Sequence, residues 1–253
     1  MDLHNRIALV TGGAHRVGKA IALGLARAGA NVIVHYGSSA GAAQDTVGEI
    51  KALGVDAAAI QADLRQPDAI DALFAAVGEQ FGRLDVLVNS AANFIREPFE
   101  DITVESWSSA METNLRAPFL CTQRAAPLLR AVERPAEEPA AIVNITDLSG
   151  IFPWQNFTQH GVSKGGLIQL TRITARELAP DIRVNAVAPG LVLPPDNTDP
   201  ARWDEFAATI PLLRSGNPEY VAQTVVFLAQ HDYITGTVIP VDGGEHLLGT
   251  PYN

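Results

Sequence analysis

Two side chains suited to proton transfer lie four residues apart in the segment His160-Gly161-Val162-Ser163-Lys164. The apolar spacing predicts a helix over residues 157–179, and a step of four residues places both side chains on one face of it. An unperturbed histidine titrates at about pH 6.5, so it can give up a proton near neutrality. Lysine supplies a positive charge beside it. The pair suits an acid–base step in which His160 donates a proton.

A glycine-rich turn suited to phosphate lies near the start of the chain. Residues Thr11-Gly12-Gly13-Ala14-His15-Arg16-Val17-Gly18 join a predicted strand, 7–10, to a predicted helix, 17–29. Such a turn directs backbone N–H groups and the positive end of the helix dipole at a pyrophosphate. Its position at the first strand–helix junction predicts a dinucleotide site, although an ordinary tight turn would also use such residues.

The residues after the second predicted strand favour NADP(H) over NAD(H). Folds selective for NAD place a carboxylate about 20 residues further on, where it holds the ribose hydroxyls. Here that place reads His35-Tyr36-Gly37-Ser38-Ser39, and the next acid is Asp45. A 2′-phosphate would meet no repulsion, and Arg16, Ser38 and Ser39 are available to contact it. Alternatively, Arg16 is a solvated residue at the helix start and the serines form a simple turn.

Short β-branched runs alternate with longer Ala- and Leu-rich segments. The predicted strands are 7–10, 31–34, 57–61, 84–88, 141–145, 183–187 and 238–241, and the predicted helices are about 17–29, 40–53, 67–81, 104–131, 157–179 and 218–230. The strands are continuously apolar, as expected when both faces of a sheet are covered. The alternation predicts a single doubly wound α/β Rossmann domain over residues 1–253, with a parallel seven-stranded sheet. Substrate would bind beyond the carboxyl ends of the strands.

Charge and composition exclude several classes of partner. The chain has 18 Lys and Arg against 28 Asp and Glu, a net charge of −10, which disfavours nucleic acid or an anionic membrane as partner. No apolar run reaches the length of a membrane-spanning helix, and the first residues lack the layout of a signal peptide. The single cysteine, Cys121, suits a reducing compartment. We therefore expect a cytoplasmic protein that acts on a small molecule. The histidines and acids show no paired zinc-site spacing, so no metal is expected.

These residues together resemble the short-chain dehydrogenase/reductase family. Thr11, Gly12 and Gly18 match its Thr-Gly-x-x-x-Gly-x-Gly turn, with Arg16 where the middle glycine is usual. Asn114 matches the asparagine that supports the family's catalytic proton path. The cofactor-binding residues predicted from the turn and from this resemblance are Thr11, Gly12, Arg16, Val17, Gly18, His35, Tyr36, Ser38, Ser39, Asp63, Leu64, Asn89, Lys164, Pro189 and Gly190.

Within the family, the chain resembles the pteridine reductases. They also have arginine in the glycine-rich loop and carry a phenylalanine, here Phe94, that stacks on the pterin ring. The segment from Pro200 and Trp203 towards residue 212 is similar to theirs, and Trp203 is the second predicted substrate residue. The chain departs from them at Ser38, where they have arginine, and at Ala92, where they have a pterin-contacting serine. Phe94 alternatively forms a pocket wall of no particular specificity.

The family's catalytic residues are serine, tyrosine and lysine, with Tyr-x-x-x-Lys on one helix. Here His160 stands in place of the tyrosine, and the family's serine-to-tyrosine spacing leads back to Asp147, an aspartate that pteridine reductases share. We hypothesise that Asp147 and His160 form a proton-donating pair and that Lys164 holds the nicotinamide ribose. Lys164 and an oxidised nicotinamide would both disfavour the imidazolium, whereas an ionised Asp147 would favour it. The alternative is a weakened relative that binds cofactor with little turnover.

The resemblance implies an NADPH-dependent oxidoreductase that reduces a carbonyl or C=N bond of a small planar substrate such as a dihydropterin. The alternatives are an NADP(H)-binding protein with weak or no turnover, and a 3-oxoacyl thioester reductase. The acidic balance modestly disfavours the latter's acidic carrier. Residues 191–214 are predicted to close over the substrate as a lid. The resemblance also implies a homotetramer or dimer joined through the helices at about 104–131 and 157–179.

Overall fold

Seven parallel strands form one sheet in the computed structural model, which describes residues 1–132, 134–135, 138–195 and 198–248. The strands are β1 (Ile7–Thr11), β2 (Asn31–Tyr36), β3 (Ala57–Gln61), β4 (Val86–Asn89), β5 (Ala140–Ile145), β6 (Ile182–Pro189) and β7 (Val238–Val241). Their order is β3-β2-β1-β4-β5-β6-β7, and each neighbouring pair is parallel. This confirms the predicted doubly wound α/β fold.

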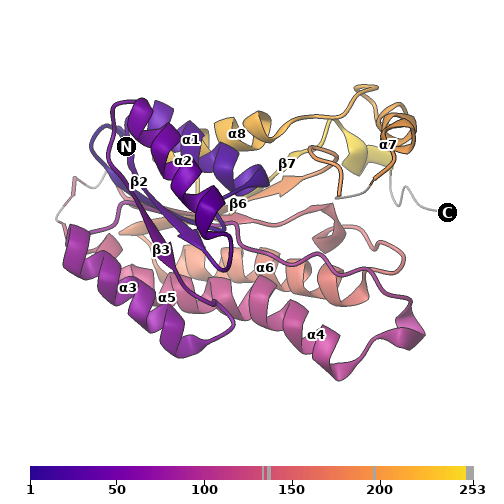
Figure 1. Cartoon of the computed structure of the whole chain (residues 1–253), viewed down its shortest axis with the longest axis horizontal. Coiled ribbons are helices and arrows are strands. Elements are labelled where there is room, and N and C mark those ends of the chain that lie inside the picture. The colour runs from indigo at the N-terminus through magenta and orange to yellow at the C-terminus, as the bar shows by residue number, and fades with distance from the viewer. Residues whose placement is uncertain (133, 136–137, 196–197, 249–253) are drawn as a thin grey trace.

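Helices cover both faces of this sheet. They are α1 (Arg16–Arg27), α2 (Ala40–Ala52), α3 (Pro67–Phe81), α4 (Val104–Met111), α5 (Ala117–Leu129), α6 (Thr158–Glu177), α7 (Pro200–Ala207) and α8 (Pro218–Gln230). Helices α1, α2 and α8 lie on one face, and α3, α5 and α6 lie on the other (Figure 1). None of the described helices is both long and apolar enough to cross a lipid bilayer.

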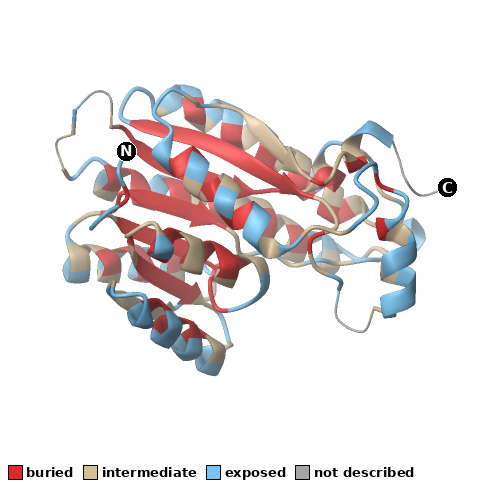
Figure 2. Cartoon of the chain, turned by 90° about the horizontal axis from the view of Figure 1, so that it is seen from above, coloured by how far each residue is buried: buried red, intermediate tan, exposed pale blue. Residues whose placement is uncertain are grey.

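Each face of the sheet carries its own apolar core. Ile21 and Leu25, one helical turn apart on α1, are buried in the first core, and Leu73 and Leu129 are buried in the second. Figure 2 shows the consequence, because the central strands are buried along their length while the helices alternate buried and exposed faces. The continuous apolar runs in the sequence therefore correspond to strands covered on both sides.

The sheet order places a crevice between β1 and β4. The chain winds from β1 towards β2 and β3 on one side and continues from β4 towards β7 on the other. The order of the strands therefore reverses at β1 and β4, and at the carboxyl edge of such a reversal doubly wound folds bind their ligands. Both the glycine-rich turn and the segment after Asn89 begin at this point.

Residues 104–131 do not form one regular α-helix, which corrects the sequence prediction. Helix α4 ends at Met111, a π-helical turn spans Glu112–Arg116, and α5 ends at Leu129. Pro118 lacks the amide hydrogen that an α-helix would direct at the carbonyl of Asn114, and the wider turn accommodates this loss. Asn114 is buried on that turn.

The predicted lid, 191–214, contains α7, a helix that the sequence pattern did not predict. The Asp199 side chain accepts a hydrogen bond from the Ala201 N–H, and Pro200 occupies the first turn. The Gly216 N–H donates to the Leu191 carbonyl at 2.8 Å, so the two ends of the segment lie together. Positions 196 and 197 lie outside the described residues. The closure of this segment over a substrate stays a prediction.

Candidate functional site

The glycine-rich turn is packed too closely to accept side chains at two positions. A Cβ atom on Gly18 would lie 2.1 Å from the Gly12 carbonyl oxygen, and one on Gly12 would lie 2.9 Å from the Ala91 Cα. Gly12 also has a φ of +65°, a conformation that favours glycine. The absence of side chains leaves the start of α1 open to a ligand's phosphate groups.

Thr11 and His35 fix this turn from beneath. The Thr11 hydroxyl oxygen accepts from the N–H groups of Ser90 and Ala91 at 2.9 and 3.1 Å, which joins the loops after β1 and β4. The His35 Nδ1 accepts from the Gly12 N–H at 3.1 Å, and its Nε2 donates to the Ala62 carbonyl at 3.0 Å. Burial lowers the pKa of His35, so this ring is held neutral with its proton on Nε2.

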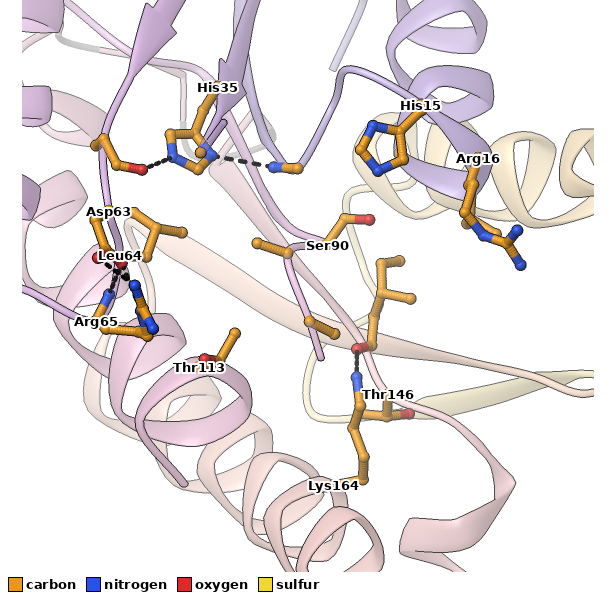
Figure 3. Close-up of a pocket in the computed structure, with 18 of the residues that line it drawn as sticks. His15, Arg16, His35, Asp63, Leu64, Arg65, Ser90, Thr113, Thr146 and Lys164 are labelled. Atoms are coloured by element: carbon orange, nitrogen blue, oxygen red, sulfur yellow. Dashed lines mark hydrogen bonds and ion pairs between the residues drawn. The ribbon is translucent and has the colours of Figure 1, made fainter. Parts of the chain in front are cut away.

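A cavity of about 450 Å³ runs from this turn to Lys164. Figure 3 shows His15 and Arg16 on one side of it, Asp63 and Arg65 on the opposite side, and Lys164 at the far end. The volume falls in the range of about 300–1,000 Å³ that is typical of small-molecule sites. The lining residues are Gly12, His15, Arg16, Val17, Gly18, His35, Gly37, Ala62, Asp63, Leu64, Arg65, Ser90, Ala91, Ala92, Thr113, Ile145, Thr146, Lys164 and Pro189.

Some predicted cofactor residues do not line this cavity, namely Thr11, Tyr36, Ser38, Ser39, Asn89 and Gly190. Tyr36 packs against the hydrophobic core, and Ser39 immediately precedes α2. The buried Asn89 amide donates to the side chains of Asn144 and Thr122, inside the protein. That these six residues contact a cofactor stays a prediction.

The two cationic side chains at opposite sides of the cavity have different partners. Arg65 forms two hydrogen bonds to the Asp63 carboxylate, at 2.9 and 2.8 Å, and these bonds lower the pKa of Asp63. Arg16 donates to the Pro194 carbonyl at 2.8 Å, which links the glycine-rich turn to the segment after β6. Arg16 adopts a φ of +55°, in the left-handed region where the family has glycine.

Asp147 and His160 form a short hydrogen-bonded pair, as the sequence hypothesis proposed. The His160 Nε2 lies 2.5 Å from Asp147 Oδ2. Asp147 Oδ1 accepts from the Ser149 N–H at 2.8 Å and from its hydroxyl at 2.5 Å. Burial raises the pKa of Asp147, but the contact with His160 and the charge of Lys164 outweigh it and lower the pKa overall. An ionised Asp147 carboxylate therefore faces the Nε2 of the imidazole.

The other nitrogen of the His160 ring is also occupied. Nδ1 lies 3.2 Å from the Asn93 carbonyl oxygen and 3.4 Å from the Asn114 amide nitrogen. Asn114 in turn donates to the Asn93 carbonyl and to the Ser163 hydroxyl, each at 3.1 Å. The π-helical turn thus brings Asn114 to the face of α6 that carries His160.

Lys164 lies deep in the site with its ammonium group on a main-chain oxygen. Its Nζ donates to the Ile145 carbonyl at 2.9 Å, and Figure 3 shows this bond at the end of the cavity. Burial lowers the pKa of Lys164, and the nearby Asp147 partly opposes that effect. The remaining N–H groups can donate to ligand hydroxyls.

Aromatic rings cover His160 on the outer side. The Phe94 ring meets the His160 ring edge to face at 4.8 Å, and Phe157 lies 4.8 Å from Phe94. His160 is only 2% exposed, whereas Phe94 is 51% exposed. Trp203 lies on α7, and its contact with a substrate stays a prediction.

Sequence reasoning missed several residues that line the cavity. Arg65 carries a signal, because it stands two residues after Asp63, a predicted cofactor-binding residue. His15 was named only as part of the glycine-rich turn, yet it faces the cavity (Figure 3). Asn93, which contacts His160 and does not line the cavity, was also missed, because it acts through its main-chain carbonyl and residue type gives no signal for that. The other missed lining residues are Gly37, Ala62, Ser90, Ala91, Ala92, Thr113, Ile145 and Thr146.

Known proteins match nearly the whole chain. Residues 12–246 match the family model described as enoyl-(acyl carrier protein) reductase. The 3-oxoacyl-[acyl-carrier-protein] reductase FabG of Staphylococcus aureus (strain Mu50) is 41% identical over 248 residues, covering 95% of this chain and 98% of the relative.

Solved structures match equally far along the chain. The Pseudomonas aeruginosa RhlG/NADP active-site complex is 39% identical with a TM-score of 0.89, covering 97% of this chain and 98% of that chain. The FolM alternative dihydrofolate reductase 1 from Brucella canis, complexed with NADP, is 30% identical with a TM-score of 0.88, covering 97% and 96%. These matches share sequence and fold with the chain from the glycine-rich turn to the end of the sheet.

Proposed function

This chain belongs to the short-chain dehydrogenase/reductase family, and we propose that it reduces the C=N or C=O bond of a small planar heterocycle with NADPH. It is an oxidoreductase whose cofactor is NADP(H), as in its relatives of known structure. The finer proposal rests on the acid pair of Asp147 and His160, which lies beside an exposed aromatic ring.

The cavity fits the cofactor. The turn at Gly12 and Gly18, where no side chain has room, would hold the pyrophosphate, and the Lys164 ammonium would hold the nicotinamide ribose. Asp63 and Arg65 would border the adenine end. NADPH, when bound, supplies the hydride. The protein's part is then to orient the substrate and to supply the proton.

We infer that the proton reaches the substrate through Asp147. The His160 ring is almost fully buried and both of its nitrogens are occupied, whereas the Asp147 side chain remains 15% exposed. When the His160 ring carries a proton on each nitrogen, it can pass the Nε2 proton to Asp147 Oδ2 across 2.5 Å and become neutral, keeping the Nδ1–H that donates to the Asn93 carbonyl. Because the pKa of Asp147 is lowered, its carboxyl group holds no proton at rest, and it passes the proton from His160 on to a ring nitrogen of the substrate.

The aromatic wall favours a planar substrate. Phe94 presents half of its surface, and Phe157 and Trp154 continue the wall, with 5.8 Å between the Trp154 and Phe157 rings. Flat heterocycles stack on such rings. The likeness to the FolM reductase from Brucella canis supports this substrate class, because its name is that of a dihydrofolate reductase.

A second candidate is a 3-oxoacyl thioester reductase. The relatives named for this activity are 37–41% identical to the chain, which is the observation that favours it. The net charge of −10 disfavours docking of an acidic carrier over a broad surface. The third reading, an NADP(H)-binding protein with little turnover, would follow if the acid pair is inactive.

The decisive experiment follows NADPH oxidation with dihydropterin, quinone, diketone and acetoacetyl thioester substrates from about pH 5 to pH 8. We expect the highest turnover with dihydropterin, increasing as the pH falls, because the donor must be protonated. Turnover with acetoacetyl thioester alone would replace the proposal with the second candidate. Clear NADPH binding without turnover on any substrate would favour the cofactor-binding reading.

Arg16→Gly is expected to raise the stability of the protein and to weaken its binding of NADPH. Glycine adopts the left-handed conformation freely, so the folded state gains about 1 kcal/mol and Tm rises by about 2–4 °C. Loss of a cation from the cavity wall should weaken NADPH binding more than NADH binding. Titration of both cofactors measures this ratio, and Arg16→Ala is the control that removes the charge without the glycine effect. Equal weakening of both cofactors would mean that Arg16 does not read the 2′-phosphate.

The exposed apolar side chains on α4, α5 and α6 support an oligomer joined through these helices. They are Trp107, Phe119, Val162 and Ile173. We propose that the chain forms a homotetramer or dimer. We also propose that it is a single domain and that residues 191–214 form a lid over the substrate. The cytoplasmic location stays a prediction.

A further inference from the structure

Glu245 is a buried carboxyl group that the proposed reaction does not use. It lies in the short helical turn at Glu245–Leu248 that follows β7, and it is 2% exposed. Its Oε2 accepts from the Leu191 N–H at 3.3 Å. A Cβ atom on Gly190 would lie 2.5 Å from the same oxygen, so the carboxyl group is packed directly against the Gly190 backbone.

The peptide that Glu245 contacts is a junction between the cavity and the predicted lid. Pro189 lines the cofactor cavity, and Gly190 follows it at the end of β6. The Leu191 carbonyl accepts from the Gly216 N–H at 2.8 Å, so both ends of the lid segment meet at this residue. Movement of Leu191 would therefore displace the cavity wall and the lid together.

We propose that Glu245 is a positioning residue for NADP(H) binding, because its carboxyl group holds the Gly190–Leu191 peptide that joins the cavity wall to both ends of the lid segment. The inference rests on the cofactor alone and does not depend on which substrate is reduced.

The Glu245 carboxyl group holds its proton to a higher pH than an exposed glutamate does. Burial raises the pKa of Glu245 to about 7, with a further contribution from Asp242, and the Leu191 N–H only partly opposes this. The Asp242 carboxylate accepts hydrogen bonds from the N–H groups of Gly244 and His246 and from His246 Nδ1. These are the charged and titratable neighbours that the described residues place around Glu245.

Ionisation creates a carboxylate that lacks water and faces a second acid. Contact with water would stabilise this carboxylate, and water can reach it only if the carboxyl group moves away from the Gly190 backbone. We therefore expect the neutral form to hold the turn and the ionised form to release it. NADP(H) affinity should then fall as the pH rises through about 7.

The test measures the Kd of NADPH and of NADH by fluorescence between about pH 6 and pH 8 for the wild type, Glu245→Gln and Glu245→Ala. A single proton on a group with a pKa of about 7 gives a loss of affinity of about tenfold over this range. Glu245→Gln should bind like the wild type at the lower pH and stay flat, because its amide is always neutral. Glu245→Ala should bind weakly throughout. NADH lacks the 2′-phosphate, so the titration of that phosphate cannot contribute to the pH dependence of the Kd of NADH.

Thermal unfolding without cofactor gives an independent readout. The raised pKa means that the folded state holds this proton where the unfolded chain has released it, so wild-type stability falls as the pH rises from about 4.5 to about 7. Glu245→Gln should therefore have the higher Tm at pH 8, with a smaller difference at pH 5. The exposed Glu79→Gln is the matched control. Parallel pH slopes for the wild type and Glu245→Gln, in affinity and in Tm, would overturn the proposal.

Discussion

Asp147→Asn is expected to lower kcat by about 10²–10⁴-fold, which is the usual loss when a positioned general acid is removed. The amide keeps the size of the side chain and can still contact Ser149 and His160, but it cannot carry a proton to the substrate. Asp147 does not line the cofactor cavity, so the Kd for NADPH should be nearly unchanged. Single-turnover kinetics together with NADPH titration measure the two quantities separately.

The pair can be tested as a unit with His160→Ala. If His160 acts only through Asp147, the double variant should lose no more activity than the worse single variant. Asp45→Asn, an exposed aspartate on α2, is the matched control and should leave kcat unchanged. Independent, multiplicative losses in the double variant would mean that His160 reaches the substrate by itself. A large gain in turnover in His160→Tyr would mean that the natural histidine is a handicap.

The fold and the start of the cavity were predictable because their signals are local. A buried parallel strand is a continuous apolar run, and Gly12 and Gly18 are required by the close approach of two backbone segments. Asp147 and His160 were paired through a known spacing, and the structure places them 2.5 Å apart. In each case a few neighbouring residues carry the information.

The remaining features depend on contacts between distant segments. His35 was predicted at the cofactor, and it lines the cavity, but its two nitrogens bond to Gly12 and Ala62. The sequence places His35 near the carboxyl end of a strand, but it does not specify the direction in which the ring nitrogens point. The Asn93 carbonyl and the Glu245 carboxyl meet their partners only after β4, α6 and β7 have assembled. The periodicity of apolar residues in the sequence does not predict such contacts.

Asp85 provides the clearest example of such a contact, and Asp85→Ala should lower the free energy of unfolding by about 3–5 kcal/mol. The carboxylate is fully buried just before β4 and accepts from the Ile7 N–H at 2.9 Å. Arg83 and Arg134 bond to it directly, and Arg6 lies 3.7 Å away. Removing the anion takes away the carboxylate that Arg83 and Arg134 share, while Arg6 keeps its ion pair with Glu138 at 2.6 Å. Tm should fall by on the order of 10 °C.

The loss of stability in Asp85→Ala should depend on pH, and the folded variant should keep its cofactor cavity. The contacts with arginine outweigh burial and lower the pKa of Asp85, so its contribution is present above about pH 4 and is lost as the pH falls through the folded-state pKa. The difference in stability between wild type and Asp85→Ala should therefore narrow in acid. Because Asp85 precedes β4 and the cavity lies beyond its carboxyl end, NADPH affinity of the folded variant should match the wild type. A wild-type Tm in Asp85→Ala would show that the arginines find other partners, and weakened NADPH binding would show that the two ends of the sheet are coupled.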